Sequence, residues 1–596
     1  MKTTRRIAPK TPRCIVPKTT RHIVPVMTVA LFLFTCQPGL FFGRGTQTSS
    51  QEQEIPKPTH RVDVVINNID VVVTDKQGRR VTGLRPENFK IFEDGLPQKV
   101  SNFYEVQGLE VKAYAPDLEH GQLSAPKKIE AAASPGPPKS IVFYFDNRQL
   151  SPLNRNSSLK TIEPFIRTTI SADKNVQGMV VCLDQNLEVI QGLTSDPETL
   201  VRAIARVAER TGQSLLEMRN REEMIGELNR MATESQKANK WRDSETALGF
   251  ARSYVETKHN DIIYSLKALN AFLGFISGVA GKKILVYVSD SMSINPAEEV
   301  FGYLDQAFPS GNARMESLNY DLTAQFKELT ARCNASEVTL YPVNTQGLET
   351  TLLSADKASG WNTFAKGSGM VKSGSRTTTE ALKIMALDTG GQAILDSREI
   401  GAGLAKVAED LEYYYSLGYK SPHREDNRYH DIRVELDDAA ADYRVRVRQG
   451  YVRVSHEEKI KEAVFSRLFY AGQQDPLGVA VQALPLKNLP GTERLQLTLK
   501  LLIPIRRLML TPQGDVYSGQ IRVYMALKDK QGEISPCYML THDIKIPAGD
   551  YALAQKRLYP YLTEMTVDKT RYTISLAVED IPGETISFLQ LEKEIR

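Results

Sequence analysis

The sequence predicts an α/β protein: a doubly wound, mostly parallel sheet with a helical insertion, framed by an N-terminal β unit and a C-terminal β-sandwich. Two apolar runs, within residues 139–151 and 281–293, each end on an aspartate and lack polar alternation, which is typical of strands buried on both faces of a parallel sheet. Helical and strand-like segments alternate around them, as in open α/β sheets. At 596 residues the chain is too long for one core, so we expect several domains.

Residues 1–44 are predicted to be a signal peptide or an uncleaved membrane anchor. Eight basic and no acidic residues flank an uncharged stretch at 23–43, an order typical of export. The stretch nearly reaches spanning length, so an anchor stays open, as does lipidation at Cys36. We therefore expect an extracytoplasmic protein (periplasmic, secreted or envelope-anchored) that meets a membrane only through its N-terminus.

Charge and cysteine content argue against a nucleic-acid-binding protein and against a disulfide-rich protein. Without the eight basic residues of the leader, 67 basic residues face 71 acidic ones, and no remaining stretch is a basic patch interleaved with aromatics, so nucleic-acid binding is not expected. The cysteines after the leader, Cys182, Cys333 and Cys537, form an odd and widely spaced set. Such a set predicts free thiols and not a disulfide framework.

A polar tether at 45–58 precedes the N-terminal β unit, at 59–114. Alternating residues at 62–74, a turn at 75–78 and an aromatic strand near 89–92 predict this unit. Residues 115–138, rich in proline and small residues, are expected to be a linker.

The α/β domain is expected at 139–418, with the helical insertion at 208–260. After the first apolar run, a helix near 159–170 and strands at 179–184 and 187–190 predict parallel crossovers. The charges of the insertion are interpreted as a solvated helix face, and a Gly/Ser/Thr segment at 366–379 as a loop. Further helices and strands are expected, in order, at 262–278, 315–336, 338–343, 380–389, 392–395 and 397–413.

Two β regions complete the chain. Within 419–455, alternation at 429–436 and 443–448 predicts an antiparallel hairpin that closes onto the N-terminal β unit and brings residues near 65 and 445 together. Residues 456–596 begin with a helix near 457–470. Short alternating strands between Pro/Gly turns then predict the β-sandwich.

Several motifs taken together resemble one family. They are residues 71–75, 81–84, 87–89, 92–95, 387–391, 414–419 and 448–451, with the two strands that end at Asp146 and Asp290. Over residues 58–455 the chain resembles the bacterial VWFA-related (acidobacterial-type) proteins, which contain a von Willebrand factor type A domain. The resemblance implies an extracytoplasmic protein with a Rossmann-like binding domain, and most such relatives have no assigned reaction.

Asp146 and Asp290 follow predicted parallel strands, at the edge where open α/β sheets bind ligands, and could share one metal or polar site. The resemblance implies a Mg²⁺ or Mn²⁺ site made by Asp-x-Ser-x-Ser, a threonine and a later aspartate. Asp146 and Asp290 match its aspartates, whereas Arg148 and Leu150 stand at its serine positions. The tentative metal ligands are Asp146, Asp290 and Thr194, with Thr211 as an alternative threonine.

Arg148 offers a second interpretation of the same edge. A guanidinium binds carboxylates bidentately, so a partner's acidic group could bind there. The candidate ligand-binding residues are Asp146, Arg148, Ser151, Asp290 and Ser291. The alternative is that Arg148 pairs internally with Asp146 or Asp290.

Sequence motifs for catalysis are weak, and no catalytic residue is assigned. Ser289 lacks the small-residue elbow of a nucleophile, and His423 and His430 flank a hydrophilic turn, where we interpret them as surface residues. The sequence therefore favours an exported, non-enzymatic protein-binding module of the cell envelope, serving adhesion, recognition or a scaffold, with a degenerate metal site. The alternative is a metal-assisted envelope hydrolase that uses Asp146 and Asp290.

Overall fold

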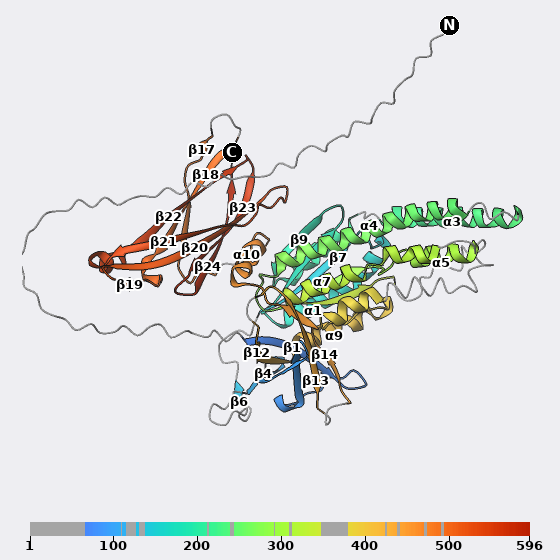
Figure 1. Cartoon of the computed structure of the whole chain (residues 1–596), viewed down its shortest axis with the longest axis horizontal. Coiled ribbons are helices and arrows are strands. Elements are labelled where there is room, and N and C mark those ends of the chain that lie inside the picture. Colours follow the sequence, from blue (N-terminus) through green and yellow to red (C-terminus); the bar gives the residue numbers. More distant parts are fainter. Residues whose placement is uncertain are drawn as a thin grey trace, which may run out of the picture. The chain divides into compact units, whose positions relative to one another are not determined.

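The computed structural model describes residues 66–108, 110–114, 127–129, 138–210, 214–238, 244–290, 292–308, 313–346, 380–423, 426–437, 442–469, 474–489 and 494–595. The predicted leader, the tether, most of the linker and the loop at 366–379 lie outside these residues. The described chain is a mixed α/β protein with several sheets and a β-rich C-terminal part (Figure 1). It divides into two compact units, residues 66–469 and 474–595.

A five-stranded sheet forms the centre of the larger unit. Its order is β11 (Val338–Asn344), β10 (Lys282–Ser289), β7 (Lys139–Asp146), β8 (Val176–Leu183) and β9 (Leu187–Thr194). All neighbouring strands are parallel except β9, which runs antiparallel to β8. The predicted parallel crossover between β8 and β9 is therefore wrong, because the short link at residues 184–186 can only reverse the chain.

Helices cover both faces of this sheet, which explains the unbroken apolar runs. Every residue of β7 is buried: Ile141 and Phe143 face one core and Val142 and Tyr144 the other. The first core is closed by α1 (Pro152–Ala172), α2 (Pro197–Ala208) and α9 (Ile400–Glu412). The second is closed by α4 (Ser244–Ile276), α7 (Thr323–Ala335) and a helix at residues 380–388. The strand expected at 392–395 is reduced to a parallel bridge between Val343 and Ile394.

The helical insertion has a core of its own. It consists of α3 (Ser214–Ala238), the first part of α4, α5 (Glu298–Ala307), α6 (Ala313–Glu316) and a 3₁₀ turn at Ser317–Tyr320. Figure 1 shows α3, α4 and α5 extending together past the sheet. Some of its charged side chains lie on solvated faces, for example in the pairs of Arg219 with Glu223 and Arg230 with Glu234, whose side chains are more than half exposed. Others pair between elements, as Arg221 does with Glu299.

Two sheets build the β domain around a shared core. One has the order β14 (Arg444–Arg446), β1 (Ile66–Thr74), β12 (Tyr413–Lys420), β4 (Val100–Gln107), β5 (Glu110–Tyr114) and β6 (Lys127–Ile129). The other has the order β15 (Gly450–Val452), β13 (Tyr429–Leu436), β2 (Phe89–Glu93) and β3 (Leu96–Gln98). Aromatic side chains such as Phe103 and Tyr415 fill the space between them.

Strands from the start and the end of this domain pair with each other, but not as part of one hairpin. Val72 of β1 pairs with Arg446 of β14, so the start and end of the domain meet. The strands β13 and β14 belong to different sheets, because β13 pairs with β2 and β15 while β14 pairs with β1.

The C-terminal unit contains two antiparallel sheets around one core that includes Leu499, Met525 and Ile574. Its first sheet has β16 (Ala480–Ala483), β17 (Lys487–Asn488), β18 (Leu495–Pro504) and β22 (Leu558–Val567). Its second has β19 (Thr511–Gln513), β20 (Val516–Asp529), β21 (Tyr538–Pro547), β23 (Arg571–Asp580) and β24 (Thr585–Glu594), with the short α11 (Tyr551–Ala554) after β21.

The boundary between the units lies after residue 469 and not before 456. Helix α10 (His456–Ser466) belongs to the larger unit. The backbone N–H of Gly278 donates to Ser466 Oγ at 3.1 Å, and the rings of Phe275 and Phe469 lie 4.4 Å apart. Packing against the C-terminal end of α4 therefore decides which unit holds α10.

The three cysteines among the described residues are free thiols, as predicted: Cys182 and Cys333 are buried and Cys537 is half-buried. Within the same described ranges, no helix is both long and apolar enough to cross a membrane.

One buried carboxylate joins the α/β and β domains. Asp410 of α9 is 1% exposed, and both of its oxygens accept from Arg446 Nη2 of β14 at 2.8 Å. The hydroxyl of Tyr341 on β11 donates to Asp410 at 2.5 Å, and Arg80, after β1, forms an ion pair with it. The carboxylate therefore links four separate segments.

Replacement of this carboxylate should weaken the larger unit strongly. Asp410→Asn removes the carboxylate charge that Arg446 and Arg80 share in a buried site, although Glu409 still lies 3.6 Å from Arg80. The loss should lower the free energy of unfolding by about 3–5 kcal/mol. Chemical denaturation measures the change. Asp442→Asn is the control, because the Asp442 side chain is 83% exposed in its pair with Lys76 and its loss should have no measurable effect. Equal losses in both variants would contradict the role assigned to Asp410.

Candidate functional site

The loop after β7 lies at the carboxyl edge of the central sheet and carries the first predicted site residue. Asp146, the last residue of β7, has no exposed surface. Its Oδ2 accepts from the Tyr287 hydroxyl at 2.6 Å and its Oδ1 from the backbone N–H of Arg148 at 3.2 Å. Burial raises the pKa of this carboxyl above its ordinary value of 3.8, and the hydrogen bonds offset only part of that rise.

Asp290, directly after β10, binds the same loop. Its Oδ2 accepts from the backbone N–H of Ser151 at 2.7 Å, and the Thr345 hydroxyl donates to its Oδ1. Its own N–H donates to the carbonyl of Gln149 at 2.9 Å. Burial raises the pKa of Asp290 as well. One carboxylate thus ties the ends of β10 and β11 to the start of α1, where Ser151 is the N-cap.

Arg148 is engaged inside the protein. Its guanidinium forms an ion pair with Asp261 of α4 and lies 4.6 Å from the ring centroid of Tyr264, with the side chain 13% exposed. Internal pairing was one of the two sequence-based interpretations, but the partner expected there, Asp146 or Asp290, is wrong. The charge is offset by a helix that packs on the sheet.

Thr194 lies at the opposite edge of the sheet. It pairs with Gly178 near the start of β8, whereas Asp146 pairs with Leu183 at the end of that strand. The antiparallel direction of β9 causes this separation, so Thr194 cannot share a ligand with Asp146. The other two predicted residues, Ser291 and Thr211, lie outside the described residues.

The structure adds three residues that sequence reasoning missed: Tyr287, Thr345 and Asp261. Thr345 directly follows β11, so the same edge argument that selects Asp146 and Asp290 could have found it. Tyr287 lies inside an apolar strand and Asp261 inside a long helix, where no local pattern separates them from packing residues.

The Mg²⁺ set implied by the family resemblance does not fit these residues. Leu150, at one serine position, is fully buried and has no oxygen to offer, and Arg148 holds Asp261. A cation at Asp146 would have to displace the Tyr287 hydroxyl. The side-chain atoms of Asn147 are buried without a hydrogen-bond partner among the described residues, but a single neutral amide does not replace the missing oxygen ligands.

Comparison with known proteins finds only solved structures with low sequence identity and low TM-scores. No protein-family model matches the chain. No curated protein matches it either. Among solved structures, the chain is similar to the vWF domain of the type V pili tip protein Mfa5 from Porphyromonas gingivalis, with 11% identity, 46% of this chain and 95% of that chain covered, and a TM-score of 0.23.

Two further similar structures are also bacterial pilus proteins. The PilB minor pilin from Streptococcus sanguinis has 8% identity, coverage of 59% of this chain and 88% of that chain, and a TM-score of 0.25. The pilus adhesin SpaC from Lactobacillus rhamnosus GG has 8% identity, coverage of 86% and 58%, and a TM-score of 0.22. Values this low do not establish a shared function.

The raised pKa of Asp146 predicts a particular dependence of stability on pH. The folded protein holds this proton more tightly than the unfolded chain, so the contribution is fully present below pH 3.8 and is lost as the pH rises through the raised pKa. Relative to Asp146→Asn, the wild type should therefore lose stability above pH 3.8, by about 1.4 kcal/mol for each unit of raised pKa.

Urea denaturation at a series of pH values measures this difference. Asp396→Asn is the control, because hydrogen bonds from Arg398 lower the pKa of Asp396, and the difference should have the opposite sign. A pH-independent difference for Asp146→Asn would show that this carboxyl titrates alike in the folded and unfolded chain.

Proposed function

We propose that this protein is an exported protein-binding module of the cell envelope, serving adhesion, recognition or a scaffold. Its α/β domain is a doubly wound, type A-like domain with a degenerate metal site. The arrangement of the carboxyl edge supports this proposal: Asp146, Asp290 and Arg148 bind groups of the protein itself and hold the edge in shape. The basic and then apolar leader supports export.

Exposed apolar side chains on segments that follow β7 and β10 in the chain carry the proposal. Leu153, the second residue of α1, is 81% exposed, and it directly follows the loop of the site. Met315 and Leu318, in α6 and the 3₁₀ turn, are 68% and 63% exposed. Their segment is anchored to the chain after β10, because Asn295 Nδ2 donates to the Ser317 carbonyl at 3.1 Å. Apolar anchors of this kind suit a protein partner.

The hydrolase alternative has less support. It requires Asp146 and Asp290 to meet a substrate, whereas Asp146 has no exposed surface and Tyr287 occupies one of its oxygens. Both carboxylates also support the loop that leads into α1.

Site-specific photo-crosslinking tests the proposed surface. A benzoylphenylalanine at position 153 or 318, in cells that export the full chain, should yield the same discrete crosslinked protein, because both positions lie on segments that follow carboxyl ends of the sheet. Position 558 is the control, since Leu558 is 51% exposed on β22 of the other unit. Absence of a crosslink at 153 and 318, or the same product at 558, would reject this surface.

A magnesium titration tests the degenerate metal site. Millimolar Mg²⁺ should shift the melting temperature of wild type and Asp146→Ala equally, because Asp146 offers no free position to a cation. A specific site with a dissociation constant one tenth of the Mg²⁺ concentration would add about 1.4 kcal/mol to the wild type alone. A saturable stabilisation that Asp146→Ala abolishes would show that the site still binds metal.

A further inference from the structure

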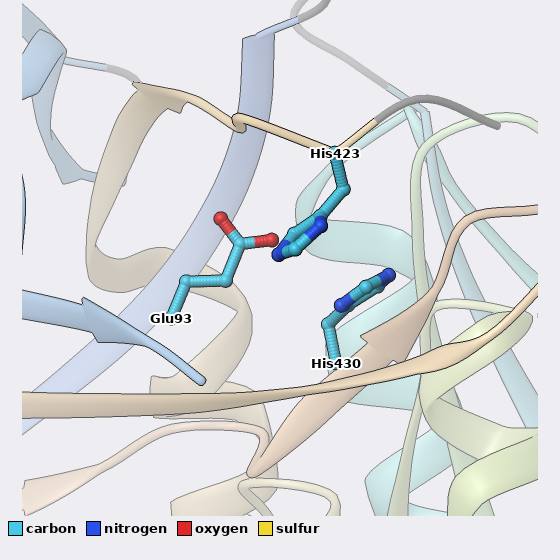
Figure 2. A group of neighbouring side chains, drawn as sticks. All are labelled: Glu93, His423 and His430. Carbon is cyan, nitrogen blue, oxygen red and sulfur yellow. The ribbon is translucent and has the colours of Figure 1, made fainter. Parts of the chain in front are cut away.

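Three potential metal ligands meet in the β domain, far along the sequence from the sheet-edge residues. Figure 2 shows the side chains of Glu93, His423 and His430 converging from separate segments. Glu93 ends β2, His430 is the second residue of β13, and His423 lies between β12 and β13. One potential donor atom from each residue lies within 4.8 Å of the other two.

Two of these polar residues occupy inward-facing positions of their strands. Alternate residues of β13 are buried, and His430 begins the inward row that continues with Ile432 and Val434. Glu93 ends the corresponding row of β2, where it pairs with Ile432. Glu93 is 1% exposed and His430 4%, so the interpretation of His430 as a surface residue is wrong. Burial of such groups is costly unless they have partners.

Glu93 is held firmly but is only half satisfied. Its Oε1 accepts from the hydroxyl of Ser421 at 2.9 Å and from the hydroxyl of Tyr451. Its Oε2 is buried and has no hydrogen-bond partner within the described ranges. A buried carboxylate oxygen without a partner loses its hydration without compensation, so this atom points to an absent ligand.

The imidazoles are surrounded by acidic groups. Asp94 Oδ2 lies 2.8 Å from His430 Nδ1 and 3.2 Å from His423 Nε2. The contact with His423 is not a hydrogen bond, because its angle is unfavourable. Asp426 Oδ1 lies 3.3 Å from His430 Nε2. A metal-bound imidazole usually donates its second N–H to a carboxylate, so one of these aspartates suits the outer shell of His430. The other aspartate must release the ring nitrogen that binds the ion.

Asp94 is fixed in place by a tight turn between β2 and β3. Asp94 and Gly95 have φ values of 49° and 79°, the conformation that two-residue hairpins require. The N–H of Asp431 donates to Asp94 Oδ1 at 2.9 Å, which leaves Oδ2 directed at the histidines. The turn after β2 and the backbone of β13 therefore hold the Asp94 carboxylate in place before any metal binds.

We propose that Glu93, His423 and His430 form a binding site for a divalent transition metal of the Zn²⁺ class. Glu93 Oε2 and one ring nitrogen from each histidine supply three ligands, and water completes the coordination. Two imidazoles with one carboxylate are a zinc ligand set, and imidazole disfavours Mg²⁺ and Ca²⁺. Tetrahedral ligands at about 2.1 Å from zinc lie about 3.4 Å apart, so donors now within 4.8 Å must close by roughly an ångström.

To bring the donors together, His423 must turn, in addition to the release of one His430 ring nitrogen by its aspartate. The two imidazole rings are stacked, with centroids 4.1 Å apart and planes 20° apart. Ring nitrogens bind metals in the plane of the ring, so parallel rings cannot share one ion. His423 has a side chain 33% exposed and lies on a connecting segment, so it can turn while His430 stays in the sheet. Metal binding would then fasten the β12–β13 connection to the β2–β3 turn.

Calorimetric titration of the untagged, chelator-treated full chain with ZnCl₂ tests this site. The wild type should bind one Zn²⁺, and Glu93→Gln and His423→Ala should each weaken binding at least tenfold. Replacement of Zn²⁺ by Co²⁺ should give the visible absorption of a four-coordinate ion in the wild type alone. His542→Ala is the control, because His542 contacts Tyr559 in the C-terminal unit and its loss should leave Zn²⁺ binding unchanged.

Two outcomes would overturn the proposal: no Zn²⁺ binding by the wild type, or equal binding by the wild type and His423→Ala. The partly exposed position of His423 makes that variant tolerable to the fold. If Glu93→Gln does not fold, the wild-type stoichiometry and the His423→Ala titration still decide the question. Both measurements are independent of the surface around Leu153, so they can fail without affecting the proposed protein-binding function.

Discussion

The contact between Asp410 and its basic and phenolic partners is the constraint on which the larger unit depends. Helix α9 ends at Glu412 and β12 begins at the next residue, so any shift of the helix moves the strand. Asp410 also binds Arg446 on β14, and both β12 and β14 pair with β1. The ion pair is buried, so its geometry matters more than its net energy. It holds the α/β sheet and the β domain in one arrangement.

A buried carboxylate with partners from the protein also determines the carboxyl edge of the central sheet. In α/β proteins, the first N–H groups of a helix at this edge are free to bind an anionic ligand. Here the Asp290 carboxylate accepts from the N–H of Ser151 at the start of α1 and takes the place of such a ligand. The positive end of the helix favours this position, although burial still raises the pKa of the carboxyl. The edge is consequently stable without a ligand, and the proposed binding would use the surface around it.

The two polar clusters of the larger unit differ in how completely they are satisfied. At the sheet edge, each carboxylate oxygen of Asp146 and Asp290 has a hydrogen-bond donor from the protein. In the β domain, one oxygen of Glu93 has none within the described chain, and two imidazoles lie beside it. The cluster around Glu93 is therefore better suited to bind a ligand than the sheet edge, although open α/β sheets usually bind ligands at that edge.

Local sequence patterns identified most strands and helices, because hydrophobic periodicity depends only on neighbours along the chain, but they also predicted a strand at 392–395 that is only a bridge in the structure. They identified β7 and β10, the alternation of β13, and the meeting of β1 with the segment near residue 445. Only the tertiary structure decided which polar groups meet. Arg148 and Asp261 are 113 residues apart, and Tyr287 and Asp146 are 141 apart. The first pair forms where a helix packs on the sheet and the second between neighbouring strands, and neither contact leaves a periodic trace in its two segments.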